Sequence, residues 1–249
     1  MNEFADKTIL VTGASSGVGR EVAIALSKKG ARVVLVARDS ERMDRTIHEM
    51  DNPDMHIAIS FDLLRLDEYH EIFNTLKEKK IKLNGLVHCA GIAPVIPLRI
   101  SNYQNSIDVF KLHYFSFVEL AKFYSKKAYS EGGSIVAVSA ISAHVPQKCM
   151  TAYSSSKAAV EAACRSLAIE LVDKNIRINS VVLGGVNTSI TANSNTSISN
   201  VTSTYENPVQ RQLLGIAEPK QVVGPILFLL SDESGFITGR ELYVDGGLL

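Results

Sequence analysis

Short runs of apolar and β-branched residues recur along the chain, separated by longer amphipathic stretches. The runs lie at positions 8–12, 32–37, 56–61, 83–89, 134–139, 177–183 and 241–244. Several of them are apolar almost throughout, which is typical of strands that are covered on both faces. The stretches between them show helical periodicity over 19–29, 40–50, 67–79, 107–130, 152–173 and 219–231. The pattern therefore predicts strands that alternate with helices.

This alternation indicates the fold class. Strands separated by helices form a parallel sheet with right-handed crossovers, so we expect a single-domain, Rossmann-type α/β fold, doubly wound, with about seven strands and helices on both faces. A chain of 249 residues suffices for one large core. Within one domain over 1–249, we expect 1–90 mainly to bind a dinucleotide and 139–215 mainly to supply catalytic residues and a substrate loop.

One segment breaks the alternation. From Thr188 to Tyr205 the sequence is dominated by Ser, Thr and Asn, and apolar periodicity is weak. A long irregular insertion near the carboxyl ends of the strands is either a lid over a functional site or a plain surface loop. The candidate lid is 191–207, and its polar character favours a hydroxylated substrate over an acyl chain.

Composition and charge narrow the class of protein. The 26 basic residues equal the 26 acidic ones, which argues against electrostatic binding to nucleic acid or to an anionic membrane. The three cysteines are odd in number and widely spaced, so we expect neither a disulfide framework nor a metal site. No secretory signal pattern opens the sequence. We therefore expect a cytoplasmic protein that acts on a small molecule.

A glycine-rich turn follows the first predicted strand. Gly13 permits a tight turn, Gly17 lets the backbone approach a pyrophosphate, and Gly19 allows close packing of the next helix. The helix N-terminus then offers free N–H groups to phosphates. The spacing is G-x-x-x-G-x-G rather than the commoner G-x-G-x-x-G, and a plain strand–helix turn is the alternative. The expected phosphate-binding set is Gly13, Ser15, Ser16, Gly17, Val18 and Gly19.

The end of the second predicted strand bears on which nucleotide binds. An acidic residue there would hold the ribose 2′-hydroxyl, whereas this chain has Arg38, which can pair with a 2′-phosphate. This favours NADP(H), with NAD(H) still possible. The alternative is that Arg38 is a surface charge that pairs with Asp39 or Glu41.

Tyr153 and Lys157 lie one helical turn apart at the start of a predicted helix. A free phenol has a pKa of about 10, and a neighbouring ammonium group lowers it toward the range in which it exchanges protons. Ser139 ends the fifth predicted strand, so we expect its hydroxyl to point into the same crevice and to bind a substrate carbonyl oxygen.

Together these motifs resemble the short-chain dehydrogenase/reductase family, of the classical type, over essentially the whole chain, and most of all its 3-oxoacyl-acyl-carrier-protein reductases. The resemblance implies a Ser139, Tyr153 and Lys157 triad. It also implies adenine contacts from Asp62 and Leu63, a segment Cys89, Ala90 and Gly91 that corresponds to the end of an N-N-A-G signature, and nicotinamide contacts from Gly184, Val186 and Thr188. Relatives place the segment ending in Gly246-Gly247 near a tetramer interface, so we expect a homo-oligomer, a tetramer or a dimer.

Three departures from the family pattern stand out. Cys89 replaces the second Asn of N-N-A-G, Leu183 replaces a Pro, and His113 stands where the family carries an Asn that holds a proton-relay water. His113 either takes over that relay or is a buried, hydrogen-bonded structural residue. The resemblance implies NADPH-dependent reduction of a ketone, either a 3-oxoacyl thioester or a keto-sugar, with Tyr153 as proton donor. The alternative is an NADP(H)-binding regulator without turnover.

Overall fold

The computed structural model describes residues 3–145, 147–190 and 207–249. Its centre is a seven-stranded sheet in the order β3-β2-β1-β4-β5-β6-β7, in which every pair of neighbours is parallel. The strands are β1 (Thr8–Thr12), β2 (Arg32–Ala37), β3 (Ile57–Ser60), β4 (Leu83–His88), β5 (Ser130–Ala140), β6 (Ile176–Leu183) and β7 (Glu241–Val244). The fold is the predicted single-domain, doubly wound Rossmann-type sheet.

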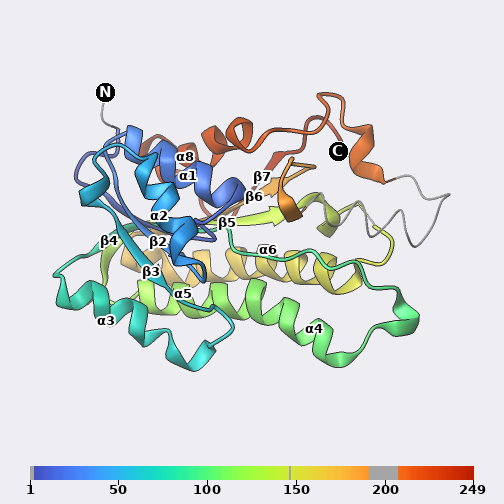
Figure 1. Cartoon of the computed structure of the whole chain (residues 1–249), viewed down its shortest axis with the longest axis horizontal. Helices are drawn as coiled ribbons and strands as arrows, with labels where there is room; N and C mark the ends of the chain where they lie inside the picture. Colours follow the sequence, from blue (N-terminus) through green and yellow to red (C-terminus); the bar gives the residue numbers. More distant parts are fainter. Residues whose placement is uncertain (1–2, 146, 191–206) are drawn as a thin grey trace.

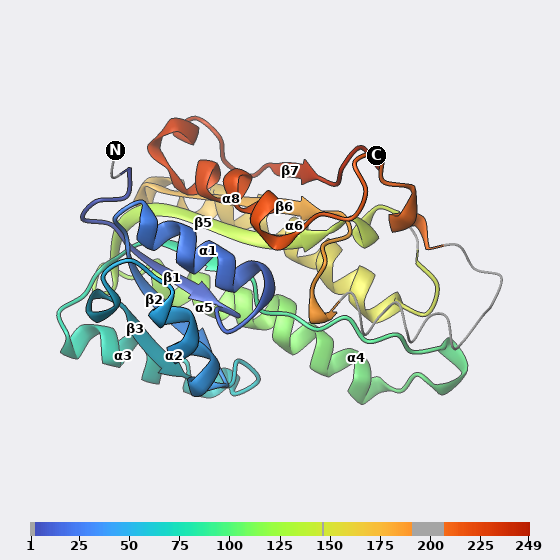
Figure 2. The ribbon, with the colours of Figure 1, turned by 45° about the horizontal axis from the view of Figure 1, so that its top comes forward.

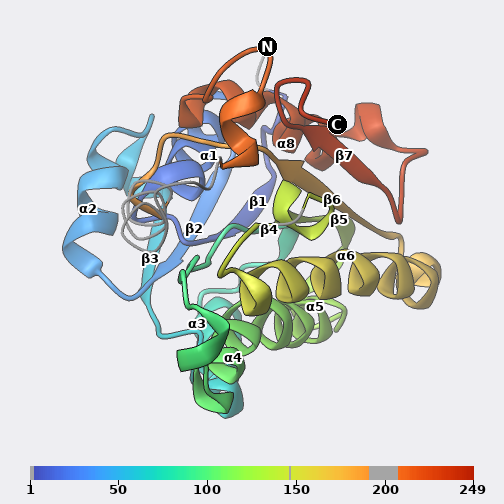
Figure 3. The same ribbon diagram turned by 90° about the vertical axis from the view of Figure 1, so that its right-hand side faces the viewer.

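Helices cover both faces of the sheet (Figure 1). One layer consists of α1 (Gly17–Lys28), α2 (Ser40–His48) and α8 (Val223–Leu230). The other layer consists of α3 (His70–Glu78), α4 (Tyr103–Phe110), α5 (Ser116–Tyr124) and α6 (Thr151–Leu171). Figure 3 shows the same two layers from the end of the sheet at which α4 begins. Within the described ranges, every helix is too short or too polar to cross a bilayer.

The two layers explain why the strands are apolar almost throughout. Along β2, Val33 and Leu35 pack into the core beneath α1, α2 and α8, whereas Val34 and Val36 pack into the core beneath α3, α5 and α6. All four side chains are fully buried, and each such burial stabilises the fold by about 1.5–3 kcal/mol. A strand with a solvent-exposed face would instead alternate apolar and polar residues.

One predicted helix differs from the observed structure. The stretch predicted as a helix over 107–130 begins earlier, at Tyr103, because the side chain of Asn102 caps α4 by accepting a bond from the Asn105 N–H at 2.9 Å. It also ends earlier, at Tyr124, since β5 begins at Ser130. Between α4 and α5 the chain makes a π-helical turn over Lys111–Phe115. Such turns are frequent at functional sites.

The strand order places a crevice at the carboxyl edge of the sheet. β1 and β4 are neighbours, but from β1 the chain continues to β2 and β3 on one side, whereas from β4 it continues to β5, β6 and β7 on the other. The loops that follow β1 and β4 therefore diverge at a switch point, where doubly wound sheets bind their ligands. Figure 2 shows the arrows of β1, β5, β6 and β7 pointing toward this same end of the molecule.

Candidate active site

The glycine turn closes tightly against the segment that follows β4. Gly13 has φ +68, and a Cβ built on it would lie 3.0 Å from the backbone of Ala90. A Cβ on Gly19 would lie 2.5 Å from the Gly13 carbonyl oxygen, so only glycine lets α1 begin this close to the turn. Ser16, the N-cap residue of α1, makes no capping bond through its side chain. The first N–H groups of α1 are thus available to an anion.

Two adjoining cavities line the carboxyl edge. The first, of about 150 Å³, is bounded by the glycine turn, the start of α6 and the end of β6. The second, of about 300 Å³, extends along the end of β2. Gly13, Ala90 and Gly91 line both. Each cofactor-binding residue expected from the sequence lines one or both cavities: Gly13, Ser15, Ser16, Gly17, Val18, Gly19, Arg38, Asp62, Leu63, Cys89, Ala90, Gly91, Tyr153, Lys157, Gly184, Val186 and Thr188.

The second cavity presents two arginines, one of which sequence reasoning missed. Arg38 and Arg42 both line it, together with Asp39. Asp39 caps α2 by accepting a bond from the Arg42 N–H at 2.9 Å, and its carboxylate lies 3.7 Å from the Arg42 Nε. The acidic neighbour is therefore paired with Arg42 rather than with Arg38. The spacing of Arg38 and Arg42, four positions apart around a helix start, was the signal in the sequence.

Lys157 and Tyr153 approach each other from one face of α6. The Lys157 Nζ donates a hydrogen bond to the Val138 carbonyl oxygen at 2.9 Å and lies 5.8 Å from the centre of the Tyr153 ring. Burial lowers the pKa of Lys157 to about 8 and raises the pKa of Tyr153 to about 12. The sequence-based expectation of a lowered Tyr153 pKa is therefore wrong for this structure, because burial outweighs the neighbouring charge. At neutral pH the phenol keeps its proton, which is the form that a proton donor needs.

Ser139 lines the first cavity, but its hydroxyl does not point into the crevice as expected. Its Oγ donates a hydrogen bond of 2.5 Å to the buried carboxylate of Glu161 on α6, and the other Glu161 oxygen lies 2.9 Å from the His144 Nε2. The Ser139 hydroxyl has this direction because successive side chains of a strand face opposite sides of the sheet. Ala137, two positions earlier, packs into the core beneath α6, so Ser139 faces α6 as well.

His113 lies fully buried in the π-helical turn with both ring nitrogens bonded. Its Nε2 accepts a bond from the Ile92 N–H at 3.0 Å, so its proton sits on Nδ1 and is donated to the Ser156 Oγ at 2.7 Å. Ser156 in turn donates to the Tyr153 carbonyl oxygen at 2.7 Å. Burial holds the pKa of His113 well below its usual value. Of the two interpretations of His113, these contacts favour the structural one, because its single proton is already committed.

A second buried histidine, His88, joins the glycine turn to the helical layer. Its Nδ1 lies 3.0 Å from the Thr12 Oγ1, and its Nε2 lies 3.2 Å from the Ser116 Oγ. Thr12 also accepts a bond from the Ala90 N–H at 3.2 Å. Burial lowers the pKa of His88 to about 3. Sequence reasoning missed this role, although a histidine at the end of an otherwise apolar strand was visible.

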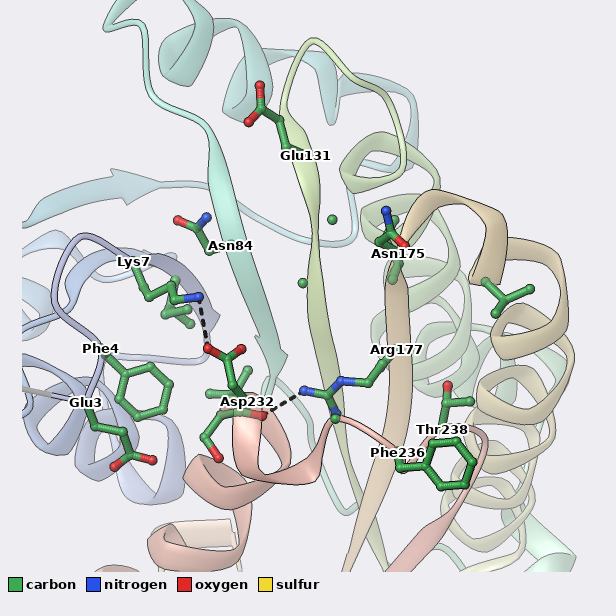
Figure 4. A pocket seen from close by; sticks show the side chains of 18 residues that line it. Glu3, Phe4, Lys7, Asn84, Glu131, Asn175, Arg177, Asp232, Phe236 and Thr238 are labelled. Carbon is green, nitrogen blue, oxygen red and sulfur yellow. Dashed lines mark hydrogen bonds and ion pairs between the residues drawn. The ribbon is translucent and has the colours of Figure 1, made fainter.

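A larger cavity lies away from these residues, at the amino edge of the sheet. It measures about 720 Å³, and its wall includes Lys7, Asn84, Arg177 and Asp232 (Figure 4). Lys7 and Asp232 form an ion pair at 3.4 Å, and Arg177 donates to the carbonyl oxygens of the chain around it. Lys7, Asp232 and Arg177 thus bind other parts of the same chain and stabilise the fold. The size of a cavity alone therefore does not identify the active site.

The described residues do not test two further expectations, the lid and the oligomer. Nearly all of the candidate lid, 191–206, lies outside the described residues. The expected homo-oligomer stays a prediction. Among the residues that the structure does describe, no three His, Cys, Asp or Glu side chains gather as a metal site requires.

Comparisons with known proteins show what the chain is similar to. A family model described as Enoyl-(Acyl carrier protein) reductase matches residues 13–249. The chain is 31% identical to carbonyl reductase family member 4 of Danio rerio, over 96% of each chain. It is 32% identical to L-xylulose reductase of Caenorhabditis elegans, over 98% of this chain and 96% of that protein. A solved short-chain dehydrogenase/reductase from Brucella melitensis superposes with a TM-score of 0.88 at 26% identity, over 99% of this chain and 98% of the other.

The buried histidines predict how stability depends on pH. Because the folded-state pKa of His113 is lowered, the unfolded chain binds a proton first as the pH falls below about 6.5, and the folded state is progressively destabilised. We expect the free energy of unfolding to fall between pH 7 and pH 5. His113→Asn should reduce that slope by up to about 1.4 kcal/mol per pH unit, measured by urea denaturation at each pH.

The exposed His48 provides the matched control. His48→Asn should leave the slope of the wild-type protein unchanged. Equal slopes for the wild-type and His113→Asn proteins would show that His113 is not held neutral in the folded state.

Proposed function

Because the chain belongs to the short-chain dehydrogenase/reductase family, whose members are NAD(P)-dependent oxidoreductases, we propose that it reduces a ketone to a secondary alcohol with NADPH, with Tyr153 as the proton donor. One observation carries this proposal: the same cavity is lined by the glycine turn, by Tyr153 and by Lys157. A dinucleotide and a phenol that holds its proton would therefore meet in one crevice.

The residues present fit NADPH. The N–H groups at the start of α1, which Ser16 does not cap, suit the pyrophosphate. Gly13 and Gly17 have no side chain to block its approach. Arg38 and Arg42 supply two positive charges at the end of β2, where Asp39 is paired with Arg42, and this arrangement suits a 2′-phosphate better than a 2′-hydroxyl. Asp62 and Asp108 also line the cavity. When bound, NADPH supplies a hydride to the carbonyl carbon.

The chain's own residues supply the proton. Burial keeps the Tyr153 phenol protonated at neutral pH, so it can donate its proton to the carbonyl oxygen as negative charge develops there. The phenolate left behind is stabilised by the Lys157 ammonium, 5.8 Å from the ring. Lys157 lines the same cavity, so we also assign it the binding of the nicotinamide ribose. His113 supplies no proton, because its Nδ1–H is held by Ser156.

The substrate we favour is a small hydroxylated ketone of the keto-sugar type. L-xylulose reductase is among the similar proteins, and the expected lid is polar. Lys126, Lys127 and Lys174, which an acyl carrier protein could contact, line a cavity beside Ser130 at the amino edge of the sheet. β5 runs from Ser130 to Ala140, so this cavity lies about 33 Å from the carboxyl edge of the same chain. That separation argues against delivery of a 3-oxoacyl thioester from those lysines to the same chain's Tyr153.

Replacement of the proposed proton donor provides the direct test. Tyr153→Phe should lower kcat by about 10²–10⁴-fold and leave the NADPH dissociation constant within about twofold, because the ring still packs against His113. The assay is NADPH oxidation with a panel of ketones that includes keto-sugars and 3-oxoacyl thioesters. Tyr103→Phe, at an exposed tyrosine, is the control.

The outcomes separate the two functions. If the Tyr153→Phe protein keeps most of its activity, Tyr153 is not the proton donor. NADPH binding by the wild-type protein without turnover of any ketone would favour a regulator, the function to which the changes at Cys89 and His113 had pointed.

The cofactor preference rests on the two arginines. Arg38→Asp should lower the ratio of kcat/KM for NADPH to kcat/KM for NADH by on the order of 100-fold, since a charge-assisted bond is lost and a repulsion introduced. Arg45→Asp makes the same charge change on α2 outside the cavity wall and should leave the ratio unchanged. If Arg38→Asp leaves it unchanged too, Arg38 does not contact the 2′-phosphate.

The lowered pKa of Lys157 predicts an alkaline limit for reduction. The ammonium form is lost above a pKa of about 8, so kcat/KM should be level near pH 7 and fall as the pH rises through 8 to 9. Lys157→Arg keeps its charge at these pH values, so any activity that this variant retains should show no such fall. A wild-type profile that stays level to pH 10 would mean that the charge on Lys157 is not required.

A further inference from the structure

Ser142 has a buried hydroxyl beside the candidate active site. It lies in a 3₁₀ turn, Ile141–Ala143, directly after β5, and only 4% of its surface is exposed. Within the described part of the chain, its Oγ has no hydrogen-bond partner. Burying an unpaired hydroxyl costs free energy, so each case in a folded protein calls for a physical reason.

The place of Ser142 in the fold suggests the reason. It lines a small cavity of about 70 Å³ together with Tyr153 and Gly184. Tyr153 and Gly184 also line the cavity beside the glycine turn, so the two cavities adjoin at the phenol. A carbonyl group that accepts the Tyr153 proton would therefore lie between the cofactor cavity and the wall that holds Ser142.

Other serines do not combine these properties. Ser154 and Ser180 also have buried, unpartnered hydroxyls among the described residues, but neither lines a described cavity of the carboxyl edge. Ser139 lines the first cavity, yet its hydroxyl donates its hydrogen bond to Glu161. Ser142 thus combines a cavity position, burial and an unused donor.

We propose that the Ser142 Oγ, rather than the Ser139 Oγ, donates a hydrogen bond to the substrate carbonyl oxygen opposite Tyr153. The proposal rests on the proposed ketone reduction. Ser142 keeps its proton throughout, while Tyr153 transfers its own to the same oxygen. As hydride reaches the carbon, that oxygen gains negative charge, and the bond from Ser142 becomes stronger in the transition state than in the bound ketone. Ser142 then acts mainly on kcat.

Paired variants test the assignment. Ser142→Ala should lower kcat for the best ketone of the panel on the order of 100-fold, with the NADPH dissociation constant within about twofold. Because the substitution removes an unpaired buried hydroxyl, the melting temperature should stay level or rise. Ser142→Thr keeps a donor and should retain more activity than Ser142→Ala.

Ser139→Ala is the matched control. It leaves the buried Glu161 without its serine partner, so it should lower the melting temperature, while kcat should fall far less than in Ser142→Ala. Two results would overturn the proposal: Ser142→Ala keeping kcat within about threefold of the wild-type protein, or Ser139→Ala losing at least as much kcat as Ser142→Ala. If Ser142→Ala melts at a lower temperature and Ser142→Thr does not restore kcat, the role of Ser142 is structural and the proposal is likewise wrong.

The failure of this proposal differs from failure of the proposed function. If the wild-type protein reduces a ketone, Tyr153→Phe loses that activity and Ser142→Ala keeps it, then the proposed ketone reduction stands and only the role of Ser142 is wrong. If the wild-type protein turns over no ketone, both the proposed function and the role of Ser142 are wrong.

Discussion

The arrangement of the site depends on the contact between two backbone segments at the switch point of the sheet. The turn at Gly13 lies so close to Ala90 that a single added carbon would stand 3.0 Å from its backbone. The next glycine along, Gly91, faces the ring of His113, whose Nε2 would lie 2.9 Å from a Cβ at that position. From His113 the contacts continue through Ser156 to the backbone of Tyr153. The place where a dinucleotide would lie and the place of the phenol are therefore fixed by one continuous series of short contacts.

Two neutral histidines strengthen that series. His88 ties Thr12, just before the glycine turn, to Ser116 on α5. His113 ties Ile92 to Ser156 on α6. A neutral imidazole has two ring nitrogens, one a donor and the other an acceptor, so each histidine bonds to two separate segments at once. The π-helical turn gives the ring of His113 its place. The cost is that both rings must remain uncharged, which burial enforces.

Much of the fold could be predicted from the sequence, and the errors have identifiable causes. Buried parallel strands read as continuous apolar runs, and the order of strand and helix determines the topology. The residues expected to bind a cofactor line the two cavities of the carboxyl edge, because short local motifs position the backbone there. The expected direction of the Ser139 hydroxyl differs from the structure, since a shift of one position along a strand turns a side chain to the other face. The shift in the pKa of Tyr153 was predicted in the wrong direction, because the charge of Lys157 is visible in a sequence but burial is not. Ser142 drew attention only once the fold brought it to the same cavity as Tyr153, whereas the spacing of Arg38 and Arg42 was already visible in the sequence.

The burial of Tyr153 also distinguishes the two directions of a reversible reaction. A phenol with a pKa of about 12 is ready to give a proton and reluctant to take up the role of base. Removing the proton from an alcohol would require the phenolate, a form that the free protein rarely holds near neutrality. The reverse step would therefore need the Lys157 ammonium to stabilise that phenolate, and this charge is itself lost above a pKa of about 8. Burial of the phenol therefore bears on the pH range in which each direction could proceed, whereas the net direction depends on the concentrations of ketone, alcohol and the two cofactor forms.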